Sequence, residues 1–540
     1  MSAVPVIVKR EPSVDAVAAL IAGGCHPLLA RVYAARGVRG PADLDDAFAR
    51  LHAPREMLNL QRMAALLADA IAARQRLLIV ADYDADGATA CAVGIRALRA
   101  FGADVAYLVP NRFEYGYGLT PEIVRLAHAQ ARPDVLITDH HLPGASLPEA
   151  WCIVNPNQPG CEFPSKHLAG VGVMFYLMLA LRAELRGRGR PGDEPVLATL
   201  LDLVALGTVA DVVRLDGNNR VLVQQGLKRI RAGRMQPGIA ALFDVAGRDP
   251  ARASAYELGF VLGPRLNAAG RLTDMALGIE CLVTDDPARA AAIAGELDAL
   301  NRQRREIEAQ MQDEALASIG EDAGDAYALT FFDPGWHQGV VGIVASRLKE
   351  RFHRPVIAFA RGSGGEAKGS GRSIPALHLR DALDLVTKRH PGLVLKFGGH
   401  AAAAGLTVRE PYLPAFRAAF DEAVRAFLTP ADLDLKLETD GSLDPRDFTF
   451  ETVRALGGCV WGQGFPEPRF CDVFDVAAQR QVGGHHLKVR LERAGRAYDG
   501  IIFGSTDALP RRVEAVYSVE LNEFNGTRGL ALTLHYWRPV

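Results

Sequence analysis

The stretch 77–89, LLIVADYDADGAT, constrains the fold more than any other part of the sequence. It opens with a short, partly β-branched apolar run that is typical of a buried strand. A helical pattern of Ala, Ile and Leu continues from residue 88 to residue 101. Between the two, three carboxylates stand at every second position: Asp82, Asp84 and Asp86. Open α/β sheets place their sites at the carboxyl ends of strands, so we expect these acids to form a site.

Carboxylates this close repel one another unless a cation neutralises them, and hard divalent cations take oxygen ligands. The stretch therefore predicts a metal site. An EF-hand loop also begins with this pattern, but it needs a Glu where Val93 stands and a helix where the apolar run predicts a strand. A solvated acidic turn is the other alternative. The G-x-G-x-x-G signature of a dinucleotide fold is absent.

Two further segments repeat this arrangement. The apolar strand expected at 135–138 leads into Asp139, His140 and His141, which are metal-ligand types. The apolar run 201–209, which we also interpret as a strand, leads to Asp211. We expect these side chains to join the first three acids around a metal.

Composition places the chain among ordinary globular proteins. Its 540 residues are 49% hydrophobic and 23% charged, enough for roughly three or four domains. No apolar run reaches membrane-spanning length, the first residues show no signal-peptide pattern, and the seven cysteines form no C-x-x-C pair, so we expect a cytoplasmic protein with reduced thiols. The net charge of −2 requires any nucleic-acid contact to come from a local arginine-rich groove.

The rest of the chain supplies binding elements. The aromatic, glycine-rich loop 111–118 suits base stacking, with a structural role as the alternative. A long charged helix is expected at 281–320, and a second α/β unit at 325–428. Within that unit the loop 369–373, GSGRS, suits a phosphate, with a flexible turn as the alternative, and the turn 398–400 brings an imidazole close to substrate. Short alternating runs between 434 and 537 predict a small β-barrel or sandwich.

In this order DYDADG, TDHH and GTVAD resemble the DHH phosphoesterase superfamily. Seven further motifs, spread over nearly the whole chain, resemble within it the RecJ family of single-stranded-DNA-specific exonucleases: VPNRFEYGYGL, GPRLNAAGRL, LNRQRR, WHQGVVGIVASRLKE, KGSGRSI, FGGHAAAAGL and WGQGFPEP. The resemblance implies an α/β fold: a parallel-sheet DHH domain and a smaller α/β DHH-associated domain joined by a long helix, then a C-terminal OB-like β-barrel. The expected divisions are 1–45 (leader), 46–280 (DHH), 281–320 (helix), 321–428 (DHH-associated) and 429–540 (OB-like).

The resemblance also implies a 5′→3′ exonuclease that uses two Mn²⁺ or Mg²⁺ ions in DNA recombination and repair. The implied metal ligands are Asp84, Asp86, His140, His141 and Asp211, with Asp82 and Asp139 close by. Expected DNA contacts are Arg112, Tyr115, Tyr117, Arg265, Asn267, Arg271, Arg302, His337, Ser370, Arg372, Ser373, His400 and Lys488. Single-stranded DNA is the implied partner, with a single-strand-binding protein and a helicase besides, and we expect a monomer.

One family motif has no counterpart here. The family carries a strand that ends in an aspartate, in a V-D-N-G or V-D-C-G context, between the aromatic loop and the DHH triplet. A βα unit of roughly 25–30 residues is therefore expected to be missing, together with one carboxylate that bridges the metals. This leaves two alternatives to an active exonuclease: a single-strand-binding protein with impaired catalysis, and a phosphodiesterase of small nucleotides, which the OB-like tail argues against.

Overall fold

The computed structural model describes residues 5–111, 120–130, 134–144, 146–189, 197–318, 325–524 and 527–540. The chain forms two compact units. The larger unit comprises residues 9–298 and 438–540, and the smaller unit comprises 299–437 with the first residues of the chain. Within the described ranges, no helix is both long and apolar enough to cross a membrane.

The parallel strands of the DHH region form two separate sheets. β2 (Arg76–Val80) pairs with β3 (Asp104–Leu108), and β4 (Leu136–Thr138) pairs with β5 (Cys152–Val154), both in parallel. β5 was not foreseen from the sequence. Side chains of β2 and β4 are partly exposed, although the sequence predicted buried strands. Among the described residues β2 and β4 have one ladder partner each, so each leaves one edge without a neighbouring strand.

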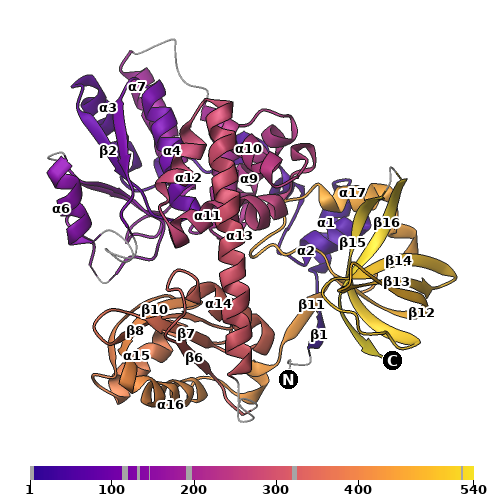
Figure 1. Cartoon of the computed structure of the whole chain (residues 1–540). Coiled ribbons are helices and arrows are strands. Elements are labelled where there is room, and N and C mark those ends of the chain that lie inside the picture. The colour runs from indigo at the N-terminus through magenta and orange to yellow at the C-terminus, as the bar shows by residue number, and fades with distance from the viewer. Residues whose placement is uncertain are drawn as a thin grey trace. The chain divides into compact units, whose positions relative to one another are not determined.

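Helices pack beside these strands and form the buried core of the DHH region. α4 (Ala85–Ala100) and α7 (Gly170–Gly187) lie side by side (Figure 1), and α8 (Leu201–Ala210) packs on both. A Cβ at Gly207 of α8 would collide with Thr89 of α4, so glycine permits their close approach. The prediction of a strand at 201–209 was wrong. LDLVALGTVA is apolar on every side, and its period cannot distinguish a buried helix from a buried strand.

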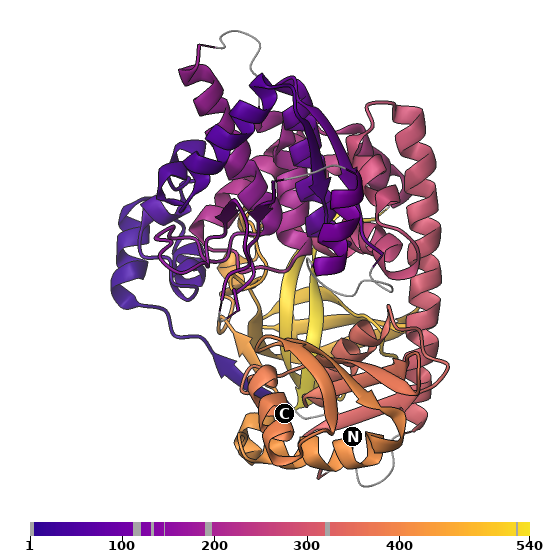
Figure 2. The same ribbon diagram turned by 90° about the vertical axis from the view of Figure 1, so that its left-hand side faces the viewer.

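The remaining helices of this region surround that core or connect it. They are α3 (Leu60–Ala72), α6 (Pro121–Gln130), α9 (Gly217–Arg231), α10 (Pro237–Val245), the π-helix η6 (Glu257–Leu262), α11 (Gly263–Leu272) and α12 (Ala276–Val283). The long helix expected from the charged segment is α13 (Pro287–Ala317), a single helix that contains the boundary between the two units (Figures 1 and 2).

The C-terminal region is a closed five-stranded barrel, which confirms the OB-like prediction. Its strands follow the order β12-β13-β14-β16-β15. They span Phe470–Val482, His486–Arg493, Arg496–Ile502, Arg512–Phe524 and Thr527–Pro539 for β12 to β16 in turn. The run near 434–438 was expected among these strands, but β11 (Lys436–Thr439) pairs with β1 (Val6–Lys9) instead.

The leader packs on this barrel rather than standing apart. It contains α1 (Val14–Ala22) and α2 (Pro27–Ala34), and Leu28 and Val32 of α2 belong to the same apolar core as the barrel, beside α17 (Phe450–Gly457). Arg36 Nη1 lies 2.7 Å from Asp440 Oδ1, and both side chains are only 1% exposed. The interface between leader and barrel therefore contains a buried ion pair.

The smaller unit is a second α/β layer. Its sheet has the order β6-β7-β8-β10-β9, with β6 (Leu329–Asp333) parallel to β7 (Val356–Arg361) and the other neighbours antiparallel. β8 spans Glu366–Arg372, β9 spans Val394–Gly399 and β10 spans Ala403–Arg409. The helices are α14 (Val341–Phe352), α15 (Leu379–Arg389) and α16 (Leu413–Arg425), which pack on the sheet.

Candidate metal centre and nucleic-acid contacts

The aspartate-rich loop runs from the end of β2 into the first turn of α4. Asp84 is the N-cap of α4, and its Oδ1 accepts a hydrogen bond from Gly87 N at 2.8 Å. Asp82 Oδ1 accepts one from Tyr83 N at 2.7 Å. A Cβ at Gly87 would lie 2.6 Å from the carbonyl oxygen of Asp82, so the loop closes this tightly only with glycine there.

Asp86 is buried and points at the N-terminus of α7. Gly170 N and Val171 N each donate to one of its carboxylate oxygens at 2.8 Å. The positive end of the helix dipole and these two bonds favour the charged form. Burial nevertheless raises the pKa of Asp86, against the opposing effect of His140. A Cβ at Gly170 would lie 2.6 Å from Asp86 Oδ2, so a larger residue would displace this carboxylate.

The DHH triplet follows β4, and its aspartate, Asp139, accepts hydrogen bonds from both histidines. Asp139 Oδ1 accepts hydrogen bonds from His140 N at 2.7 Å and from His141 N at 3.1 Å. It also lies 2.9 Å from His141 Nδ1, and this bond raises the pKa of His141 to about 9. Burial would raise the pKa of Asp139, but the bonds from the two histidines outweigh it and lower that pKa. Asp139 thus fixes the orientation of the His141 imidazole and holds the backbone of both histidines.

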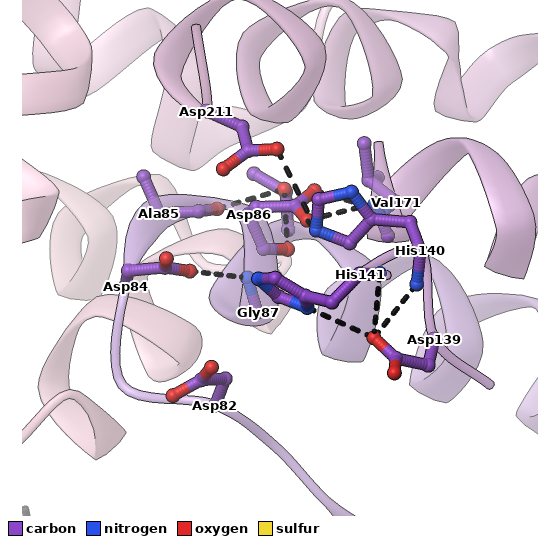
Figure 3. A network of polar contacts seen from close by, with 12 residues as sticks. Asp82, Asp84, Ala85, Asp86, Gly87, Asp139, His140, His141, Val171 and Asp211 are labelled. Carbon is purple, nitrogen blue, oxygen red and sulfur yellow. Dashed lines mark hydrogen bonds and ion pairs between the residues drawn. The ribbon is translucent and has the colours of Figure 1, made fainter. Parts of the chain in front are cut away.

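Three of the predicted ligands meet at one point. Single ligand atoms of Asp86, His140 and Asp211 all lie within 4.8 Å of one another. His140 Nε2 is 3.6 Å from Asp86 Oδ2 and 3.6 Å from Asp211 Oδ2, and Figure 3 shows its ring between the two acids. Burial lowers the pKa of His140, which favours the neutral, ligating form. Asp211 is the C-cap of α8, so the prediction of a strand end there was wrong, and its carboxylate lies in the cluster with Asp86 and His140.

The donor set fits a divalent ion. Asp211 Oδ2 is buried and has no hydrogen-bond partner among the described residues. Burial, and then the charges of Asp86 and Asp84, raise the pKa of Asp211 well above its usual value. Burial, followed by the charge of Asp84, also raises the pKa of Asp82 to about 6. A cation would relieve both costs, and two carboxylates with an imidazole are ligands that Mn²⁺ accepts.

Three asparagines support the centre, and two of them, Asn155 and Asn157, were missed from the sequence. Asn155 follows β5, and its Nδ2 donates to His141 O at 2.8 Å; Nδ2 of Asn157 donates to His140 O at 2.7 Å. Asn155 stands directly after a strand, so the strand-end rule would have found it had β5 been recognised. Asn267, which the sequence predicted to bind DNA, accepts a hydrogen bond at its Oδ1 from Ala85 N at 2.9 Å, so it also holds the aspartate loop.

In the smaller unit, several predicted phosphate contacts lie together. Arg372 Nη1 donates to Ser370 Oγ at 3.0 Å, and burial lowers the pKa of Arg372. A Cβ at Gly342 would lie 2.9 Å from that Oγ and 3.0 Å from Arg372 Nη2, so the first turn of α14 borders both side chains. His337 accepts from Gly339 N just before this helix. No carboxylate of the described chain pairs with Arg372, which leaves its guanidinium available for an anion.

The other predicted contacts have different surroundings. Ser373 is buried, its Oγ donates to Leu377 O, and its N–H donates to Ala402 O beside the His400 turn. Arg265 pairs with Asp298, with Nη2 at 2.9 Å from Oδ1. The remaining predicted contacts stand on three different elements: Arg271 is on α11, Arg302 is on α13 and Lys488 is on β13. Arg112, Tyr115 and Tyr117 lie outside the described residues.

Three family models match the chain in the order of these structural regions. They are the DHH family N-terminal domain at 76–208, the DHHA1 domain at 324–426 and the RecJ OB domain at 439–536. Fold and site thus define the chain as a protein of the DHH class with an OB barrel.

Comparison with characterised proteins shows to which family within this class the chain belongs. The chain is 47% identical to the single-stranded-DNA-specific exonuclease RecJ of Escherichia coli K12 over 98% of its own length and 99% of that protein. It is 49% identical to the RecJ of Dickeya dadantii, covering 95% of this chain and 96% of that one. A RecJ crystal structure with Mn²⁺ from Thermus thermophilus matches with a TM-score of 0.83 at 32% identity, over 99% of this chain and 79% of that one. The chain belongs to the RecJ family.

The comparison with the Escherichia coli relative also shows a difference in length. It extends over 571 aligned positions, whereas this chain has 540 residues. At least 31 positions of that relative therefore have no counterpart here, the difference between those two numbers.

Proposed function

We propose that this protein is a divalent-metal-dependent exonuclease that hydrolyses single-stranded DNA from the 5′ end. The convergence of Asp86, His140 and Asp211 on one point, with an unsatisfied carboxylate oxygen, carries the proposal. Membership of the RecJ family supports the substrate, because its characterised members are named single-stranded-DNA-specific exonucleases. RecJ structures with Mn²⁺ and with Mg²⁺ support the choice of metal.

The chain's own residues provide most of the geometry for this reaction. Asp86, His140 and Asp211 would hold metal, with Asp84, Asp82 and the Asp139–His141 pair at the border of the site. When bound, divalent ions polarise a phosphodiester and lower the pKa of a bound water. Asp139 orients the His141 imidazole, and the N-terminus of α7 positions the Asp86 carboxylate. These supports fix the ligands before substrate arrives.

The 5′ end is proposed to bind at Ser370 and Arg372, beside the first turn of α14. A guanidinium, a hydroxyl and the positive end of a helix together make charge-assisted bonds to a terminal phosphate. The absence of a carboxylate partner for Arg372 among the described residues supports this role. The barrel, with Lys488 on β13, is proposed to bind the strand further from its end.

The central test is metal-dependent cleavage of a 3′-labelled single strand. His140→Ala should reduce Mn²⁺-dependent cleavage to background while the circular dichroism spectrum stays unchanged. The matched control is His390→Ala, which removes an exposed histidine at the end of α15. Wild-type cleavage by the His140 variant would refute the assignment of the centre.

The phosphate site has its own test. Arg372→Ala should slow cleavage of a 5′-phosphorylated strand more than that of a 5′-hydroxyl strand. Arg361→Ala is the control, because Arg361 ends the neighbouring strand β7 and already pairs with Glu410. An equal loss on both substrates would argue against a terminal-phosphate site.

A second candidate is a single-strand-binding protein with impaired catalysis, and the divided sheet favours it. We propose that the missing positions include a βα unit between residues 120 and 138, whose strand would lie between the free edges of β2 and β4. Two observations support this: the two separate strand pairs, and the greater length of the Escherichia coli relative. Comparing cleavage rate with binding affinity separates the two candidates, because the second predicts tight binding with slow cleavage.

The location, oligomeric state, partners and domain divisions of the protein are proposed by resemblance to the RecJ family. We propose a cytoplasmic monomer that acts in recombination and repair beside a single-strand-binding protein and a helicase. We also propose the domain divisions 1–45, 46–280, 281–320, 321–428 and 429–540. Light scattering of the purified protein tests the monomer, and a dimer mass would overturn it.

A further inference from the structure

Two exposed aromatic side chains stand on the surface just before α11, the helix that carries Asn267. Tyr256 is 57% exposed and Phe260 is 73% exposed, unusually high values for rings of this size. Their rings stack on each other with centroids 5.2 Å apart and an interplanar angle of 26°. One face of such a pair remains available to a third planar group.

Phe260 stands on η6 and Tyr256 is the N-cap of that helix, a π-helix, a rare conformation that occurs frequently at functional sites. This helix lies directly against the end of α8. A Cβ at Gly259 would lie 3.1 Å from Val209 Cγ1, and a Cβ at Gly263 would lie 3.0 Å from Ala210 Cβ. Ala210 is the residue before the metal ligand Asp211, so Phe260 stands on a segment in contact with the metal centre's own helix.

The same segment continues over the aspartate loop. α11 follows η6 without a break, and its Asn267 holds Ala85 N. A Cβ at Gly270 would collide with the carbonyl oxygen of Tyr83. The backbone after Asp211 is also unusual, because Val212 is β-branched, 64% exposed and adopts φ 63°. A strained, exposed residue beside a metal ligand is typical of a surface kept for function.

Two exposed arginines precede the pair in the chain. Arg248 and Arg252 are exposed in the segment that precedes Tyr256. Glu257, the acid nearest to the rings in sequence, is turned inward, since its Oε2 accepts hydrogen bonds from both N and Oγ of Ser254. Arg248 and Arg252 thus precede the rings in the chain, together with the exposed Asp249, and the carboxylate of Glu257 is already hydrogen-bonded.

We propose that Tyr256 and Phe260 form a stacking platform for an unpaired base of the DNA strand that is being cut. This deepens the proposed function and rests on it. Every base offers a π face, so the platform tolerates any sequence. A base in a duplex already has both faces stacked on its neighbours, so the platform accepts single strands in preference to duplexes. It holds the strand on the segment that contacts α8 and so contributes to binding of the strand rather than to the chemical step.

The test begins with binding in Ca²⁺ or EDTA, where cleavage does not interfere. Removing one stacked base costs about 1–3 kcal/mol, or roughly 5- to 150-fold in affinity. Phe260→Ala should weaken binding of a labelled single strand by a factor in this range, and Phe260→Trp should restore it. Phe427→Ala is the matched control, because Phe427 is 49% exposed in the smaller unit. Both rings are exposed, so thermal stability should stay unchanged.

A scan of substrates with one abasic residue identifies the partner base. The wild type should lose affinity strongly at one abasic position, and Phe260→Ala should be insensitive at that same position. In Mn²⁺ the same variant should raise KM with little change in kcat, and its preference for a 5′-phosphate should persist. Equal abasic sensitivity in wild type and variant, or unchanged affinity of the variant, would overturn the platform.

The outcomes separate this inference from the proposed function. A wild type that binds and shows the abasic signature but does not cleave would refute the nuclease and keep the platform. A wild type that cleaves single strands without the abasic signature would keep the nuclease and refute the platform. A wild type that does not bind single strands at all would overturn both.

Discussion

Replacing Asp211 by asparagine should stabilise the metal-free protein. With metal bound, the wild type should be the more stable of the two. Asp211 Oδ2 is buried without a hydrogen bond among the described residues, and Asp86 lies in the same cluster. In the metal-free protein at neutral pH, the charge of Asp211 is therefore a cost. Asp211→Asn removes the charge and keeps the shape, so metal-free stability should rise.

The magnitude follows from that burial. Burial and the neighbouring carboxylates raise the pKa of Asp211 well above its usual value, and each unit of that rise costs the charged form about 1.4 kcal/mol, so the metal-free variant should gain at least about this free energy of unfolding at neutral pH. Metal has the opposite effect: a ligand at 100 times its Kd adds about 2.7 kcal/mol to a protein that binds it only when folded. With Mn²⁺, the wild type should therefore overtake the variant.

Thermal unfolding in EDTA and in a Mn²⁺ titration measures both effects. The matched control is Asp202→Asn, at the start of the same helix. Asp202 is also buried, but its carboxylate accepts from Leu203 N at 2.9 Å and from Gln236 N at 2.6 Å. This control should keep the full response to Mn²⁺. A Mn²⁺ response in Asp211→Asn equal to that of the wild type would refute the reasoning, as would a less stable metal-free variant.

Three other predictions concern stability and the divided sheet. Arg36→Ala removes one partner of the buried pair with Asp440 and should cost about 3–5 kcal/mol, seen as an early loss of barrel structure in urea. Burial raises the pKa of Asp202 from 3.8 to about 6, so the folded state holds this proton more tightly than the unfolded state. Stability should therefore fall by about 3 kcal/mol as pH rises from 3.8 through 6, and Asp202→Asn should remove this slope in pH-dependent denaturation; an unchanged slope would contradict it. Inserting a βα unit that ends in V-D-N-G between Pro133 and Val135 should raise cleavage by on the order of 10²-fold, and equal rates with and without it would show that the unit is dispensable.

The sequence alone determined the local chemistry and the general architecture. A β-branched run that ends in alternating acids predicts a strand-end site, because side chains at the carboxyl end of a strand project from the sheet edge. The motif order identified the family, and short alternating runs predicted the barrel. These features depend on residues that are close in sequence, where period and composition are sufficient.

Other features depended on tertiary contacts. Asp82, Asp84 and Asp86 are equivalent in pattern, yet Asp86 is the one that joins His140 and Asp211, because the N-terminus of α7 holds its carboxylate. The run before Asp211 is a helix because it is surrounded by other helices, and no pattern of an all-apolar segment reveals that environment.

The role of Asn267 likewise could not be read from its motif. Its partner, Ala85 N, is 182 residues away in sequence, and nothing in the sequence indicates that the two residues lie close together in the fold. The same holds for the exposed pair at η6, since stacking on the surface and packing in a core have the same aromatic spacing in sequence. What surrounds a side chain is a property of the folded chain, and this surrounding decides whether a polar or aromatic group binds, supports or is buried.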